Sequence, residues 1–190
     1  MMITLVRHAE VEERYLSCYN GHIDIGLSKR GHEQAKALAE HFESNRFDAV
    51  YCSDLIRARE TLSPIPLSAA PNFTNQLREK SWGRHEGKTF DEIKMMENEG
   101  YESFDQWLAL LDGEDMKAYT DRIGHFFTAF LPAQEYENVL IVTHAGVVRS
   151  LMSILRKIPI EEAFGIQFGY ANYVVVDTDT WQYGPVICPV

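Results

Sequence analysis

The sequence predicts an α/β protein in which helices flank a sheet with a parallel core. Short apolar runs rich in β-branched residues recur along the chain, and segments with apolar residues at helical spacing alternate with them. This alternation is typical of parallel strands that are joined by crossover helices. A chain of 190 residues is ordinary for one globular domain, so we expect a single domain over residues 1–190.

The first half of the sequence contains two strand–helix pairs. Residues 3–6 form a short apolar run that is typical of a buried strand. Ser28 is then placed to cap a helix whose apolar residues recur at helical spacing. Residues 49–52 predict a second strand, and a helix that starts at residues 53–54 must end before Pro64.

The second half of the sequence continues this alternation of strands and helices. Residues 139–143 predict a third strand, preceded by a long helix at residues 115–131 and followed by a helix at residues 144–155. Residues 174–176 and 182–187 predict two more strands.

The stretch between the second and third of these strands is less regular. It contains the sequence W-G-R-H-E-G at residues 82–87, and an acidic amphipathic segment follows as far as Asp115. We interpret roughly residues 80–115 as a helical lid inserted between two strands. No internal repeat or low-complexity segment stands out, so the sequence predicts neither a linker nor a second domain.

Composition and charge exclude several classes of protein. The formal net charge of −10 disfavours binding to nucleic acid or to an anionic membrane, because both need a basic surface. The sequence has no apolar run of about 18 residues, as a membrane span requires, and its amino-terminal apolar run is too short for a signal peptide. The three cysteines lie far apart without a C-x-x-C pair, which predicts reduced thiols. We therefore expect a cytoplasmic protein.

Polar side chains follow the three core strands at the points where those strands end. Arg7 and His8 follow the first strand, Ser53 and Arg57 the second, and His144 the third. Because the carboxyl ends of parallel strands share one edge of a sheet, we expect these side chains to converge. Arginine matches the oxygens of a phosphate group, and a neutral imidazole can attack phosphorus. The sequence therefore predicts a local phosphate pocket with a histidine nucleophile.

Each of these residues alone is weak evidence, since a single Arg-His pair after a strand is common by chance. Their joint arrangement is what favours a functional site. The main alternative interpretation of these residues is a metal site. The sequence has no H-E-x-x-H and no close pair of histidines, so we expect no metal and no cofactor. His85 could contact substrate, whereas the remaining histidines are interpreted as surface or turn residues: His22, His32, His41 and His125.

Four blocks of the sequence, in order, resemble motifs of the histidine phosphatase superfamily, which includes the phosphoglycerate mutases. They are L-V-R-H-A-E at residues 5–10 with G-H-I-D-I-G-L-S-K-R-G at 21–31, V-Y-C-S-D-L-I-R-A-R-E-T at 50–61, L-R-E at 77–79 with E-G at 86–87, and V-T-H-A-G at 142–146. The resemblance implies a three-layer α/β/α sandwich with a mostly parallel central sheet, as in phosphoglycerate mutase.

The resemblance also implies roles for individual residues. It assigns His8 as the nucleophile and Glu79 as the proton donor. It assigns Arg7, Arg57 and His144 as ligands of the phosphate group.

Two positions depart from the family pattern. Ala9 stands where the family has glycine, and we expect it to be tolerated if its φ is negative. Arg14 stands where many members carry an asparagine six residues after the nucleophile. Asn20 is our candidate to replace that asparagine as a phosphate ligand.

Within the superfamily, the chain length and the lid sequence look most like the α-ribazole-5′-phosphate phosphatases of cobalamin biosynthesis. The expected partner is a small-molecule phosphate ester. Alternatives that stay open are a broad-specificity phosphatase, a small mutase-like enzyme, an inactive protein that binds a phosphorylated ligand, and a metal-dependent hydrolase. The sequence also leaves open whether the protein is a monomer or a homodimer.

Overall fold

The computed structural model describes residues 1–97 and 100–189, and a six-stranded sheet lies at its centre with the order β3-β2-β4-β1-β5-β6. The strands are β1 (Met2–Arg7), β2 (Ala49–Ser53), β3 (Pro71–Thr74), β4 (Asn138–Thr143), β5 (Tyr173–Asp177) and β6 (Gln182–Tyr183). The four strands from β3 to β1 are parallel to one another, whereas β5 and β6 are antiparallel to their neighbours. The predicted α/β class with a mostly parallel sheet is confirmed.

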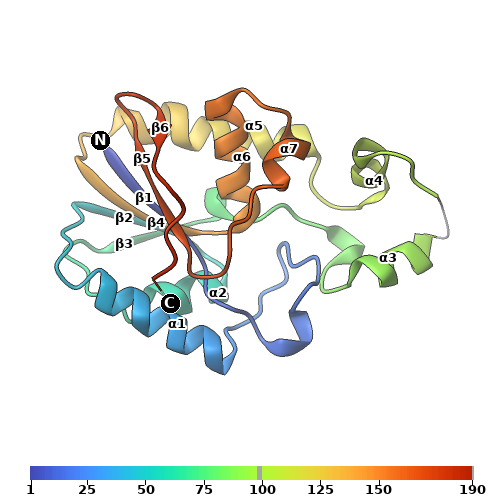
Figure 1. Cartoon of the computed structure of the whole chain (residues 1–190), viewed down its shortest axis with the longest axis horizontal. Helices are drawn as coiled ribbons and strands as arrows, with labels where there is room; N and C mark the ends of the chain where they lie inside the picture. The colour runs from blue at the N-terminus through green and yellow to red at the C-terminus, as the bar shows by residue number, and fades with distance from the viewer. Residues whose placement is uncertain (98–99, 190) are drawn as a thin grey trace.

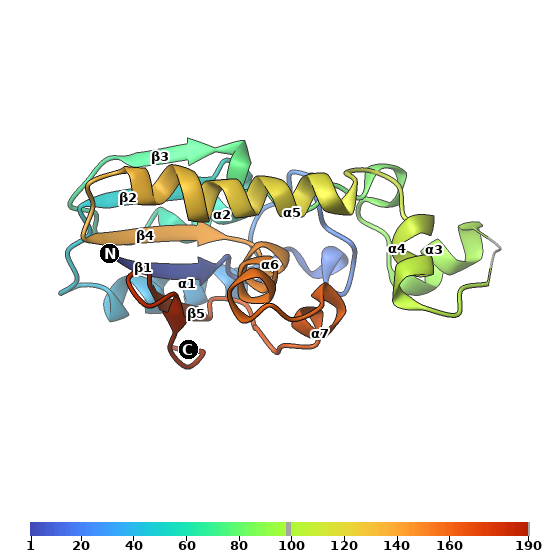
Figure 2. The ribbon, with the colours of Figure 1, turned by 90° about the horizontal axis from the view of Figure 1, so that it is seen from above.

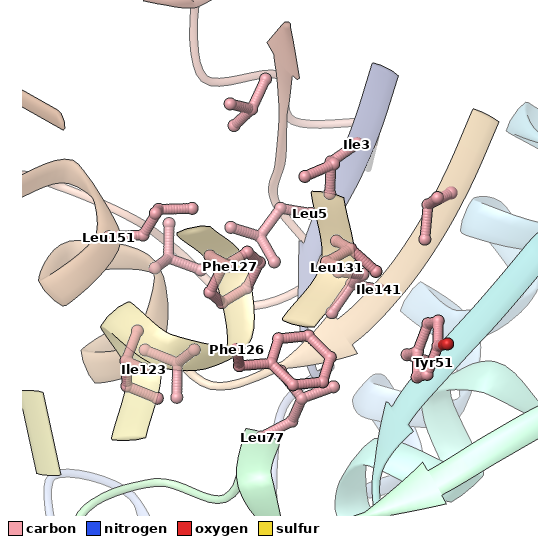
Figure 3. Close-up of a cluster of buried hydrophobic side chains, with 14 of the residues drawn as sticks. Ile3, Leu5, Tyr51, Leu77, Ile123, Phe126, Phe127, Leu131, Ile141 and Leu151 are labelled. Atoms are coloured by element: carbon pink, nitrogen blue, oxygen red, sulfur yellow. The ribbon is translucent and has the colours of Figure 1, made fainter. Parts of the chain in front are cut away.

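Helices cover both faces of this sheet (Figures 1 and 2). α1 (Lys29–His41) and α2 (Ile56–Leu62) lie on one face, and α5 (Met116–His125) and α6 (Ala145–Arg156) lie on the other. Successive strand residues point to opposite faces, so Leu5 packs toward α5 and α6, and Val6 packs toward α1 and α2. Figure 3 shows the first of the two cores, where α5 and α6 meet β1 and β4.

The caps of two predicted helices are present. Ser28 accepts a hydrogen bond from the Gly31 N–H at 2.9 Å at the start of α1. Asp115 does the same for the Ala118 N–H at the start of α5, at 2.9 Å. The predicted helix at residues 115–131 begins there and continues beyond α5 through a wider π-helical turn, Phe126–Phe130.

Three details of the prediction were wrong. α2 begins at Ile56 rather than at residues 53–54, because Ser53 belongs to β2 and the Ile56 N–H is capped by Asp24 at 2.7 Å. β6 is shorter than the predicted 182–187, with only a single bridge joining Ile187 to Tyr173. The edge strand β3 was not predicted, since it is four residues long and starts with a proline.

The segment predicted as a lid contains α3 (Phe90–Glu97) and α4 (Phe104–Leu110), and both lie beyond one end of the sheet (Figure 2). They have a small apolar cluster of their own, formed by Trp82, Ile93, Trp107 and Leu111. A short helix, α7 (Ile160–Phe164), follows α6. Among the described residues, no helix combines the length and the apolar character that crossing a bilayer needs.

Candidate active site

The register of two neighbouring strands brings His8 and His144 together. Arg7 at the end of β1 pairs with Thr143 at the end of β4, so the histidine that follows each strand emerges at the same edge. The His8 N–H donates to the Thr143 carbonyl at 2.8 Å. The two imidazole rings meet edge to face, with centroids 5.1 Å apart.

The imidazole of His8 is oriented as a nucleophile. Its Nδ1 lies 2.7 Å from the Ala9 carbonyl oxygen, which can only accept, so Nδ1 carries the proton. Burial, and then the charges of Arg57 and Arg7, hold the pKa of His8 well below its usual 6.5. The ring is therefore neutral, and Nε2 keeps a lone pair that can attack phosphorus.

His144 caps the start of α6 and is fully buried. Burial, and then the charge of Arg57, hold the pKa of His144 well below 6.5, so this ring is also neutral. Its Nε2 lies 2.8 Å from Ser53 Oγ, and its buried Nδ1 has no hydrogen-bond partner among the described residues. If the Ser53 hydroxyl donates to Nε2, Nδ1 carries the proton and can donate to a phosphate oxygen.

Arg57 is completely buried beneath the loop that follows β1. Its Nη1 donates to the Ile23 carbonyl at 2.8 Å, and Nη2 donates to the carbonyls of Asn20 and Gly21 at 2.9 and 2.6 Å. Burial lowers the pKa of Arg57 to about 10, which leaves the guanidinium charged at neutral pH. Its buried Nε has no partner among the described residues and can donate to an anion.

Glu86 organises the same loop from the other side. Its carboxylate accepts from the backbone N–H groups of Gly21 and His22 at 2.8 Å and of Ile23 at 3.0 Å. The loop thus donates its N–H groups to Glu86 and presents its carbonyl groups to Arg57. In the sequence, Glu86 belongs to the E-G motif at residues 86–87, which predicts no particular role for it.

Arg7 is held by Phe168 and Tyr170, which come from the segment before β5. Its Nη1 donates to the Phe168 carbonyl at 2.6 Å, and its guanidinium carbon lies 3.9 Å from the centre of the Tyr170 ring. Its Nε is buried without a partner in the described part of the chain. Like Arg57, Arg7 therefore keeps one donor uncommitted beside His8.

Glu79 reaches the same site from the segment that follows β3. Its Oε2 accepts from the Gly146 N–H at 2.8 Å, in the first turn of α6. Its Oε1 accepts from the Tyr119 hydroxyl at 2.8 Å and from the Lys80 N–H at 3.0 Å. A Cβ at position 146 would collide with the Glu79 carboxylate, so the close approach requires glycine there.

These groups surround a cavity of about 270 Å³. Among the predicted site residues, Arg7, His8, Asn20 and Glu79 line the cavity. Arg57 and His144 are not part of this lining and are fully buried, and the charge of Arg57 acts on both His8 and His144. The rest of the lining includes the rings of four aromatic residues: Tyr19, Trp82, Phe164 and Tyr170.

The two departures from the family pattern have simple structural counterparts. The non-glycine residues with positive φ in the described chain are Ser17, Lys157, Ala171 and Trp181, so Ala9 has the negative φ that it needs. Arg14 packs its guanidinium over the Tyr15 ring at 4.4 Å, outside the cavity lining.

Asn20 lies in the cavity lining, where its Nδ2 donates to the Tyr15 carbonyl at 2.6 Å. One N–H bond of that amide is left over for a ligand. The backbone carbonyl of Asn20 already supports Arg57.

Sequence reasoning missed Tyr119 and Arg149. The sequence gives no indication of a functional role for Tyr119, because a tyrosine on the apolar face of an amphipathic helix is ordinarily interpreted as a core residue. Arg149 lies one turn after Gly146 on α6, a spacing that could have placed it on the cavity side. His85 does not line the cavity: it is fully buried, and its Nε2 lies 2.6 Å from Glu97.

No group of three or more metal-ligating side chains comes together within residues 1–97 and 100–189. The anion pocket is built instead from guanidinium and imidazole groups. The α/β fold and this neutral, oriented histidine form an arrangement that can carry phosphoryl transfer through histidine.

The chain belongs to the histidine phosphatase superfamily, branch 1, whose family model matches residues 3–186. It is 27% identical over 186 residues to the adenosylcobalamin/α-ribazole phosphatase of Escherichia coli strain K12, covering 93% of this chain and 90% of the relative. It is 26% identical to phosphoserine phosphatase 1 of Hydrogenobacter thermophilus, covering 92% and 85% of the two chains.

The crystal structure of the α-ribazole phosphatase from Shigella flexneri is also similar. It superimposes with a TM-score of 0.83 at 26% sequence identity, covering 99% of this chain and 96% of that one. The three-layer, phosphoglycerate mutase-like fold that the resemblance implied is therefore confirmed.

Proposed function

We propose that this protein is a phosphomonoesterase that transfers the phosphoryl group of a small-molecule ester to His8 and then to water. The observation that carries this proposal is the His8 imidazole itself. It is neutral, its Nδ1 is fixed on the Ala9 carbonyl, and the residue lines a cavity together with Arg7.

In the first step, His8 Nε2 attacks phosphorus and the bond from phosphorus to the ester oxygen breaks. The uncommitted Nε groups of Arg7 and Arg57, with His144, stabilise the phosphate oxygens in the transition state. Glu79 gives a proton to the departing alkoxide.

In the second step, water attacks the phosphohistidine and the N–P bond breaks. The Glu79 carboxylate accepts the proton of that water, which restores its protonated form. Phosphate then leaves and His8 is neutral again, so atoms and protons balance over the cycle without a metal ion.

Glu79→Gln tests this proton transfer. The variant should lose about 10²–10⁴-fold in the phosphorylation rate with an alkyl phosphate, because glutamine cannot protonate an alkoxide. With p-nitrophenyl phosphate the loss should be much smaller, since nitrophenolate leaves without a proton. The comparison belongs in the pre-steady-state burst, and equal slowing for both substrates would reduce Glu79 to a structural group.

For the substrate we propose α-ribazole 5′-phosphate, because relatives with which the chain aligns almost end to end are named as α-ribazole phosphatases. The cavity, at about 270 Å³, is slightly smaller than the usual ligand pocket, which favours a small molecule over a large one. The rings of Tyr19, Trp82 and Phe164 give it flat apolar walls that suit a benzimidazole base.

A substrate panel with and without EDTA tests this assignment. We expect kcat/KM for α-ribazole 5′-phosphate to exceed that for 3-phosphoglycerate and phosphoserine by at least about tenfold, as two ring contacts would provide. EDTA should have no effect. Phe164→Leu should reduce this difference in kcat/KM. Phe130→Leu should not, because the Phe130 ring is exposed on another part of the molecule. Comparable kcat/KM values would favour a broad-specificity phosphatase, and loss of activity in EDTA would favour a metal-dependent enzyme.

We propose the segment around α3 and α4 as a lid over this cavity. Tyr19 supports the idea, because it lines the cavity, and its hydroxyl accepts a hydrogen bond from Trp107 Nε1 of α4 at 2.9 Å. Tyr19 also packs edge to face against Trp82, with ring centroids 5.2 Å apart. Movement of α4 would thus reach the cavity wall directly.

Asn20 is proposed as a further phosphate ligand through its second amide N–H. A cytoplasmic location fits the composition, and a homodimer is retained as a proposal that gel filtration with light scattering would test.

A further inference from the structure

Tyr119 is the only side chain with a hydrogen bond to the Glu79 carboxyl group among the described residues. The other two donors, Lys80 and Gly146, use their backbone N–H groups. The Tyr119 hydroxyl lies 2.8 Å from Glu79 Oε1, and the tyrosine is fully buried on α5. Glu79 is therefore held between α5 and α6, with one contact that a side-chain substitution can remove.

We propose that Tyr119 is a positioning residue that fixes the orientation of Glu79 and sets the pH range over which Glu79 exchanges its proton. This inference rests on the proposed function, in which Glu79 must be protonated for the first step and charged for the second. Tyr119 contacts Glu79 rather than the reacting atoms, so it acts through the carboxyl group.

The chemistry of the contact gives the direction of the effect. A hydrogen bond to a carboxylate is roughly twice as strong as one to a neutral acid, so a donor on Oε1 favours the charged form of Glu79. Burial, and then the charge of Glu79, raise the pKa of Tyr119 well above 10, which keeps its hydroxyl protonated. Tyr119 therefore remains a donor over the whole working range of pH.

Other charged or titratable groups lie around Glu79 and would remain in a Tyr119 variant. They are Arg7 beside β1, Arg57 of α2, Arg149 of α6, Lys80 next to it in sequence, His22 against its backbone carbonyl, and His8 across the cavity. Since Tyr119→Phe changes none of these, its effect isolates the hydroxyl group.

The experiment is a titration of the Glu79 side chain by ¹³C NMR in protein labelled at the glutamate carboxyl carbon. Glu79→Gln identifies the signal by its absence. In Tyr119→Phe the titration midpoint should move up by about 0.5–1 pH unit, because the charged form has lost a donor. The alkaline limb of the phosphorylation rate with an alkyl phosphate should move up by the same amount.

Tyr173→Phe is the matched control. Tyr173 is also a buried tyrosine, and its hydroxyl is bonded to His41 at 2.7 Å on the opposite face of the sheet. This variant should leave both the midpoint and the rate profile unchanged.

An unchanged Glu79 midpoint in folded Tyr119→Phe, or an equal shift in Tyr173→Phe, would overturn the proposal. The NMR titration does not depend on turnover. A negative result in the titration would therefore not count against the proposed function. The pre-steady-state burst of the Glu79→Gln variant tests that function separately.

Discussion

His8→Asn is expected to abolish turnover, with a loss on the order of 10⁴–10⁶-fold in kcat, the scale seen when an enzyme loses its covalent nucleophile. Asparagine places an amide nitrogen near the position of Nδ1, so it can still donate to the Ala9 carbonyl as His8 does at 2.7 Å. It has no atom that can replace Nε2 as the nucleophile. Steady-state hydrolysis of p-nitrophenyl phosphate measures the loss.

The control for His8→Asn is phosphate binding. Arg7, Arg57 and His144 are untouched by the substitution, so inorganic phosphate should still bind and raise the melting temperature. A folded variant that keeps more than about a hundredth of wild-type kcat would point to a nucleophile other than His8.

Arg57→Lys should lower kcat by on the order of 10²–10³-fold, the effect of removing one oxyanion donor. Arg57 uses three N–H bonds on loop carbonyls while its Nε stays free for the phosphate. A lysine ammonium group has only three donors on one atom and cannot hold the loop and the phosphate at the same time. Steady-state kinetics should show the loss mainly in kcat.

Arg59→Lys is the matched control for Arg57→Lys. Arg59 lies on the same short helix, but its guanidinium packs over Phe73 at 5.0 Å. This substitution should leave kcat within about twofold of wild type, because the residue does not approach the phosphate. Full activity in Arg57→Lys would show that Arg57 does not stabilise the transferred phosphoryl group.

The sheet and its functional edge could be predicted because the local sequence marks both the central strands and the points where they end. The runs that became β1, β2 and β4 are short and buried on both faces, and a polar residue marks where each one ends. Parallel pairing then places His8 beside His144 without any knowledge of side-chain positions.

Glu79 could not be found from the residues in this way. It follows an irregular turn, and nothing in its local sequence distinguishes it from a solvated loop carboxylate. Only the family resemblance selected it. In the structure the reason is tertiary: its partners Tyr119 and Gly146 lie 40 and 67 residues away.

Tyr119 and Glu86 illustrate the same limit. Each supports a site residue through contacts that depend on how distant segments fold. The periodicity of the sequence therefore indicates only that Tyr119 lies on an apolar helix face and that Glu86 is a polar residue.

The strand β3 was not predicted for a different reason. A four-residue edge strand with an exposed Phe73 has neither the length nor the burial of the central strands.

The most direct test of the central claim is to trap the phosphoenzyme. Protein mixed with ³²P-labelled substrate and quenched in alkali should carry label on the peptide that contains His8, because phosphohistidine is stable to alkali. The label should disappear in acid and should be absent in His8→Asn. Acid-stable label on Ser53, or label that persists in His8→Asn, would contradict the account.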